Sequence, residues 1–61
     1  MTPELTKEAR DALAWAIDNG VISSGQETEE SIIKTVENQE IVSFCNSKGT
    51  VSFDIHDVIY S

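Results

Sequence analysis

The stretch IVSFCNSKGTVSFDI, residues 41–55, decides the fold of this 61-residue chain. Two runs rich in β-branched and aromatic residues, 41–45 and 50–55, flank the polar segment Asn46-Ser47-Lys48-Gly49. Asn and Gly are favoured in tight turns because both tolerate backbone conformations that other residues avoid. The pattern therefore predicts two antiparallel strands joined as a β-hairpin.

The length of the turn decides which side chains share a face, because a slip of one residue moves every side chain to the opposite face. A four-residue loop places these residues on one face: Val42, Phe44, Val51, Phe53 and Ile55. A three-residue loop with a Gly bulge groups Ile41 and Cys45 with the apolar residues of the second strand, and leaves Val42 and Phe44 as an exposed pair. Both registers are compatible with the sequence. The tail, residues 56–61, either forms a last helical turn or extends the strand.

The N-terminal segment has the pattern of an amphipathic helix over residues 3–18. Its apolar side chains recur at helical spacing: Leu5, Ala9, Ala12, Leu13, Ala16 and Ile17. We expect Thr2 to cap this helix and Pro3 to occupy its first position. Gly20 supplies a stop signal, after which residues 21–22 fold back onto the helix end.

A second helix is predicted from Glu27 or Thr28 to about Asn38. Its core-facing residues are Ile32, Ile33 and Val36. The β-branching of this run also permits a strand over residues 31–36. With the helix, the sequence predicts a single α+β domain spanning residues 1–61, in which two helices pack on one face of a C-terminal antiparallel hairpin (α-α-β-β).

The charge of the chain bounds its function. The chain contains eleven Asp and Glu residues and four Lys and Arg residues, which gives a formal net charge of −7. Such a one-sided field opposes direct binding to nucleic acid or an anionic membrane, which need clustered Lys and Arg, and favours a partner with a basic surface. The longest apolar runs fall far short of the roughly 20 residues that span a bilayer. A single cysteine and no signal-peptide pattern predict a cytoplasmic protein.

Neither catalysis nor cofactor binding has a matching pattern in this sequence. Cys45 and His56 make one pair of soft ligands, short of the four in a structural zinc site, and no third group orients them as nucleophile and base. Cys45 is expected to face inward or lie at an interface. Phosphate loops, zinc-protease motifs and calcium loops are also missing. We expect no enzyme, no metal and no cofactor.

The first helix carries the most suggestive functional arrangement. At 100° per residue, Trp15 lies on the flank of the apolar stripe. Four carboxylates fall on the same side: Glu4, Glu8, Asp11 and Asp18. An aromatic anchor with a charged rim is typical of a binding hot spot for a basic partner. Alternatively, Trp15 covers the edge of the hairpin and serves the core.

The second helix provides another acidic surface, with Glu30 and Glu37 as candidate contacts and Lys34 as its one cation. If the helices lie side by side, their carboxylates form an extended strip that imitates a phosphate backbone. An acidic exterior that only keeps the protein soluble produces the same pattern.

The last third of the chain contains three short motifs: Glu40-Ile41, Lys48-Gly49-Thr50-Val51-Ser52-Phe53 and Asp57-Val58. Together they resemble the wing and following segment of excisionase-type winged-helix domains, in which a Gly precedes an aromatic by four residues and an Asp–hydrophobic pair follows. The resemblance implies that a helix over residues 29–37 enters the major groove of DNA. That segment carries three glutamates and one lysine, so the resemblance points to a degenerate winged-helix accessory protein of transcription.

Our leading interpretation is a small acidic protein-binding module, a stoichiometric inhibitor or modulator of the kind that phages or mobile elements encode. It covers a basic or nucleic-acid-binding surface of a larger protein. A chain this small buries only about 60% of its unfolded surface, which also favours self-association. The alternatives are therefore the winged-helix accessory protein and a homodimer whose interface uses Val42, Phe44 and Tyr60.

Overall fold

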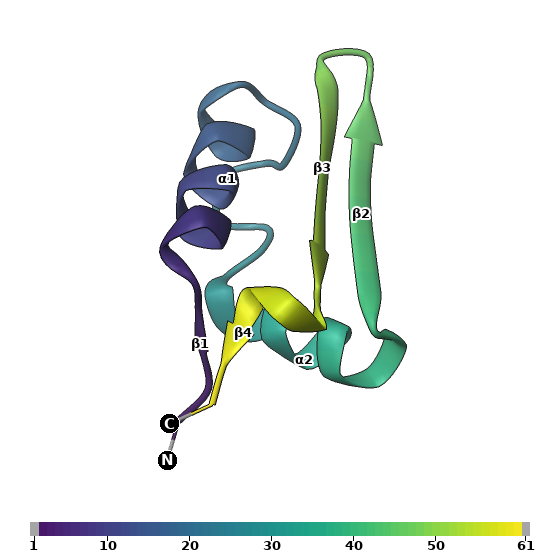
Figure 1. Cartoon of the computed structure of the whole chain (residues 1–61). Helices are drawn as coiled ribbons and strands as arrows, with labels where there is room; N and C mark the ends of the chain where they lie inside the picture. The colour runs from purple at the N-terminus through teal and green to yellow at the C-terminus, as the bar shows by residue number, and fades with distance from the viewer. Residues whose placement is uncertain (1, 61) are drawn as a thin grey trace.

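Two helices precede a β-hairpin in the computed structural model, which describes residues 2–60. The elements follow in this order: β1 (Glu4–Leu5), α1 (Lys7–Asp18), α2 (Glu29–Gln39), β2 (Ile41–Asn46), β3 (Gly49–Asp54), a 3-10 turn η1 (Ile55–Asp57) and β4 (Val58–Ile59). Figure 1 shows α1 beside β3, while α2 crosses the end of the hairpin opposite the turn. The predicted α+β architecture, with two helices packed against a C-terminal antiparallel hairpin, is confirmed.

The start of the first helix differs from the prediction. Helix α1 begins at Lys7, so neither Thr2 nor Pro3 belongs to it. Thr6 is the N-cap, because its backbone is extended and its hydroxyl accepts a hydrogen bond from the Ala9 amide at 3.1 Å. This bond satisfies one of the amide groups that the first helical turn leaves without a partner.

The residues before Thr6 pair with the other end of the chain. Strand β1 runs antiparallel to β4, with Glu4 opposite Ile59 and Leu5 opposite Val58. The Thr6 amide continues this contact by donating to the Asp57 carbonyl at 2.9 Å. Strand pairing requires extended backbone, so Glu4 and Leu5 cannot be part of α1. The tail thus forms η1 and then β4, and Ser61 lies outside the described residues.

The end of α1 follows the predicted stop. Gly20 has a left-handed backbone with φ of 76°, and the amides of Val21 and Ile22 donate to the Ala16 carbonyl at 2.8 and 3.2 Å. Both side chains are buried against the core, as expected for residues that fold back onto the helix end.

Helix α2 begins at a reciprocal cap. Thr28 Oγ1 accepts from the Ser31 amide at 3.1 Å, and Ser31 Oγ accepts from the Thr28 amide at 3.0 Å. The strand alternative for residues 31–36 is therefore wrong, and the predicted core residues of this helix are buried: Ile32, Ile33 and Val36. The helix ends at Glu40, which adopts a left-handed backbone with φ of 70° and leads directly into β2.

The hairpin adopts the register of the four-residue loop. Val42 pairs with Phe53 and Phe44 with Val51, so these four side chains share the inner face. The ladder continues to Asn46 and Gly49, and Asn46 Oδ1 accepts from the Lys48 amide at 2.8 Å inside the turn. The three-residue alternative with a Gly bulge is wrong, because the side chain of Asn46 already organises a tight turn. Ile55, expected on the same face, has left the strand to begin η1.

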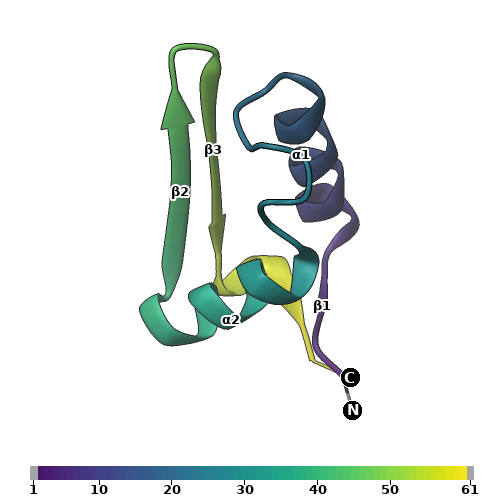
Figure 2. The same ribbon diagram turned by 180° about the vertical axis from the view of Figure 1, so that it is seen from behind.

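The core is centred on β3. Val51 and Phe53 on its inner face are 8% and 1% exposed, whereas Val42 and Phe44 of β2 are only half-buried. In both views α1 lies on the β3 side of the hairpin, and β2 is the strand farther from it (Figures 1 and 2). Helical cover is thus complete over β3 and incomplete over β2.

Substitution of Thr6 and of Thr2 tests which of the two residues caps α1. Thr6→Ala removes the observed cap and should lower the free energy of unfolding by about 1 kcal/mol. Thr2→Ala shortens an exposed side chain outside the helix and should change the free energy of unfolding by no more than about 0.5 kcal/mol. Urea unfolding followed by circular dichroism measures both, and an equal loss in the two variants would contradict the assigned cap.

Candidate functional site

Trp15 lies on the surface of α1 with 46% of its area exposed. The six-membered ring of the indole rests on the hairpin turn, where a Cβ placed on Gly49 would be 3.1 Å from Trp15 Cη2 and 3.5 Å from Val21 Cγ2. Gly49 therefore admits the ring because it has no side chain. The indole both covers the turn and presents a large apolar surface to solvent.

Three of the four predicted carboxylates accompany Trp15 on α1. Asp11 precedes it by one turn, Glu8 by two turns, and Asp18 follows it by three residues, so helical geometry places them along one side. All three are exposed. Glu4 belongs to β1 and not to the helix, so the expectation that it lies on the same helical face is wrong. The cause is the later start of α1.

Two cations reduce the negative charge near this group. Lys7 Nζ lies 3.7 Å from Asp11 Oδ2 in an exposed pair, a contact that contributes little to stability in water. The Lys48 side chain extends over Gly20, with Nζ 3.0 Å from where a Cβ would be. This position is at the C-terminal end of α1, whose own last turn contains no basic residue, so Lys48 complements the helix dipole there.

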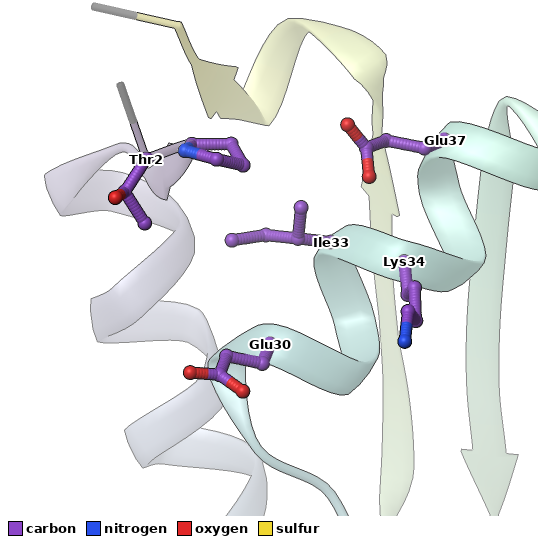
Figure 3. A pocket seen from close by; sticks show the side chains of 6 residues that line it. Thr2, Glu30, Ile33, Lys34 and Glu37 are labelled. Carbon is purple, nitrogen blue, oxygen red and sulfur yellow. The ribbon is translucent and has the colours of Figure 1, made fainter.

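The predicted contacts on α2 border a shallow hollow of about 240 Å3. Figure 3 shows Glu30 and Glu37 toward opposite ends of it, with Ile33 between them and Thr2 on the facing segment. Lys34 also lines the hollow. The volume is below the roughly 300 Å3 at which small-molecule sites usually begin.

The acidic groups of the two helices are on separate surfaces. Helix α2 lies across the end of the hairpin and not alongside α1 in either view (Figures 1 and 2). The carboxylates near Trp15 and those at Glu30 and Glu37 therefore do not form the single strip that side-by-side helices would create. Any partner that contacts both groups must span two elements.

A contact between the tail and α2 was not apparent from the sequence. The Tyr60 hydroxyl donates to Glu37 Oε2 at 3.0 Å, although the two residues are far apart in the chain. Partial desolvation of the phenol, then this hydrogen bond and the charge of Glu37, raise the pKa of Tyr60 above its ordinary value. Tyr60 thus holds the end of the chain against α2.

Cys45 and His56 are not brought together. Cys45 is exposed beside the turn, where it accepts a hydrogen bond from Thr50 Oγ1 at 3.2 Å, so the expectation of an inward-facing cysteine is wrong. His56 lies in η1 beyond the other end of β3, with Nδ1 3.7 Å from Asp54 Oδ1. Within residues 2–60, no three His, Cys, Asp or Glu side chains gather as metal ligands, and no helix has the length and apolar character to cross a membrane.

Comparison with known proteins assigns no family: no family model, curated protein or solved structure matches the chain. The two surfaces described above are the candidates for function. Of these, the Trp15 side of α1 combines an exposed aromatic ring, a fixed orientation and adjacent carboxylates.

The contact between Trp15 and Gly49 can be tested with the fluorescence of the only tryptophan in the chain. Gly49→Ala should displace the ring, shift its emission to longer wavelength and increase quenching by acrylamide. Gly25→Ala is the control, because Gly25 also has a positive φ, of 81°, but a Cβ there meets nothing within 4 Å. The control should lose about 1 kcal/mol of stability through backbone strain, with unchanged emission. Identical spectra for both variants would show that the ring does not rest on the turn.

The contact between Tyr60 and Glu37 predicts a pH dependence, which the single tyrosine reports through its absorbance. The midpoint in the native protein should lie above 10, and Glu37→Gln should lower it toward 10. Because the folded protein favours the neutral phenol, the stability from this contact is complete below the unfolded pKa and is lost as pH rises through the folded pKa. Glu30→Gln makes a matched control, since Glu30 does not bond to Tyr60, and a midpoint that moves equally in both variants would contradict the assignment.

Proposed function

We propose that the protein is a small acidic protein-binding module that acts as a stoichiometric inhibitor or modulator. It covers a basic or nucleic-acid-binding surface of a larger protein in the cytoplasm. The observation that carries this proposal is the exposed indole of Trp15, fixed between α1 and the hairpin turn. Other large apolar side chains are also exposed, but among the described residues Trp15 alone combines a large aromatic ring, an apolar contact that orients it and three adjacent carboxylates.

The fixed orientation of Trp15 favours tight binding. A side chain that is already held at two points loses little conformational freedom when a partner covers it. Tryptophan is also among the residues that most often dominate the energy of an interface. The ring therefore suits the role of a central anchor.

The carboxylates supply attraction and orientation. Glu8, Asp11 and Asp18 form an exposed rim along the same side of α1 as Trp15. With a net charge of −7, the chain attracts a basic surface from a distance, and the rim then favours one orientation over others. Glu30 and Glu37 on α2 are available to a partner large enough to extend across the hollow between them.

Occlusion is the mode of action that fits these surfaces. The described hollows are shallow, and the carboxylates at them are exposed, whereas a general acid or base needs burial to adjust its pKa. Direct binding to DNA is disfavoured because α2 presents Glu29, Glu30 and Glu37 where phosphates would approach. These observations support the proposal of a binding protein over that of an enzyme or a DNA-binding regulator.

The test begins with capture of proteins from nuclease-treated bacterial lysate on the immobilised chain, followed by titration of the purified captured protein. In titrations followed by Trp15 fluorescence or calorimetry, affinity should fall at least about tenfold between about 50 and 500 mM salt. Trp15→Ala should weaken binding by about 30-fold, the effect of a hot-spot residue worth about 2 kcal/mol. Asp11→Asn with Asp18→Asn should reduce mainly the association rate and the salt dependence.

Ile59→Ala provides the matched control, because Ile59 is 47% exposed but lies on β4, away from α1. It should bind like the native chain. Far-ultraviolet circular dichroism confirms that every variant is folded before binding is compared. Binding that ignores salt, or Trp15→Ala with native affinity, would refute the proposal, and retention of duplex DNA in a gel shift at low salt would instead favour the winged-helix alternative.

A further inference from the structure

Strand β2 forms an open edge of the hairpin. Within the described part of the chain it pairs only with β3, and no strand runs beside its other side, although the last turn of α2 reaches past that side where β2 begins (Figures 1 and 2). Hydrogen-bonding direction alternates along an antiparallel strand, and the pair Asn46–Gly49 closes the turn. The backbone groups of Ile41, Ser43 and Cys45 therefore point away from β3.

This edge lacks the features that usually prevent strands from pairing with other chains. Its six residues, Ile41–Asn46, include no charged side chain, proline or glycine, and the ladder with β3 runs without a bulge. Edge strands of monomeric proteins are commonly protected by such features. Their absence is notable in a chain that carries a net charge of −7.

The inner face at β2 is also incompletely covered. Val42 and Phe44 point to the same side as the buried pair Val51 and Phe53, yet they remain half-buried because α1 covers β3. The Phe44 ring packs against Phe53 edge to face, with centroids 6.4 Å apart, and keeps part of its area accessible. Another strand added beside β2 would cover the remainder.

We propose that β2 pairs antiparallel with β2 of a second copy of this chain, which joins the two hairpins into one four-stranded sheet. A two-fold axis at Phe44 places Phe44 of both copies opposite each other on the inner face. In this register Ser43 of each copy is opposite Cys45 of the other, so residues with outward-facing backbone groups meet. An interface position also accounts for the exposure of Cys45.

Charge at the ends of β2 favours a second copy as the occupant. Glu40 immediately precedes the strand and Lys48 lies in the turn that follows it. Antiparallel pairing about Phe44 places the backbone of Glu40 of each copy opposite that of Lys48 of the other. The Lys48 side chain extends over Gly20 in the monomer, and its rotation toward the Glu40 carboxylate of the second copy would make the edge complementary to itself. The strand between them is uncharged, so the two acidic chains meet there without opposed carboxylates.

Salt distinguishes this association from the binding of a basic partner. Two copies each with a net charge of −7 repel at long range, and salt screens that repulsion more than it weakens backbone pairing. Dimerisation should therefore strengthen with salt, whereas binding through Trp15 should weaken. The two proposals use different elements, and either can fail alone.

Sedimentation equilibrium of the full chain over a concentration series tests the proposal. The native chain should dimerise, with a dissociation constant that falls on the order of tenfold between about 50 and 500 mM salt. Ser43→Pro removes an outward amide from the β2 edge and should leave a monomer. Ser52→Pro is the matched control: Ser43 and Ser52 face each other and share one hydrogen bond of 2.9 Å, but the Ser52 amide points to the opposite edge. It should dimerise like the native chain.

Charge reversal at Glu40 and Lys48 tests the same dimer if either proline variant fails to fold. Glu40→Lys alone and Lys48→Glu alone should each weaken the dimer about threefold or more, and the double variant should restore it. A native chain that stays monomeric at millimolar concentration in high salt would overturn the proposal. So would dimerisation that is unaffected by Ser43→Pro in a folded variant, or single reversals with no effect.

Discussion

The burial of Phe53 on the inner face of β3 is the interaction on which the rest of the structure depends. Phe53 is the largest fully buried side chain, and the buried cluster to which it belongs includes residues from β1, both helices, the segment after α1, and β4. A chain of this length has too little apolar material for a second core, because small domains bury only about 60% of their unfolded surface. Truncation of one such aromatic side chain typically costs about 3–5 kcal/mol, a large fraction of the total for a small domain.

Concentrating the core on β3 leaves β2 dependent on its partner strand. No residue of β2 is fully buried, although β2 and β3 are equal in length. The strand is held by its ladder with β3, by the packing of Val42 and Phe44 against the buried core, and by the bond from Asn46 Nδ2 to the Gly20 carbonyl at 2.8 Å. Because β2 is paired on one edge only and its apolar side chains are half-buried, association at this strand would add the most stability to the domain.

The hairpin and the C-terminal end of α1 were predictable because the residues that specify them are adjacent in sequence. Gly20 stops α1 and residues 46–49 form the turn between the strands, each through residues adjacent in sequence. The sequence left two hairpin registers open, and the structure selects the one with Val42 and Phe44 on the inner face. The start of α1 was not predictable in this way: Thr2 was expected to be the cap, and Thr6, the observed cap, also precedes a glutamate by two residues, so this local pattern does not separate them. Only the pairing of β1 with β4 decides between them, and two-residue strands from opposite ends of a chain leave no periodic pattern.

In the candidate site, too, local features were predictable and long-range contacts were not. Helical spacing correctly indicated that Trp15 lies beside Asp11 and Asp18, and that its ring lies outside the core stripe. It could not reveal that Gly49 supports the ring, because that contact joins elements distant in sequence. The position of Glu4 was wrong for the reason that moved the helix start, so one long-range pairing accounts for both errors.

The two proposed surfaces reinforce each other physically. Trp15 is on α1, which lies on the β3 side of the hairpin, so pairing at β2 leaves it accessible (Figure 1). A two-fold dimer would present two indoles and double the charge of −7, which increases the attraction of a basic partner. The same charge opposes the dimer at low salt, so a basic partner that neutralises carboxylates would also relieve repulsion between the copies. Partner binding and self-pairing are then coupled through one electrostatic term, and each should raise the affinity of the other.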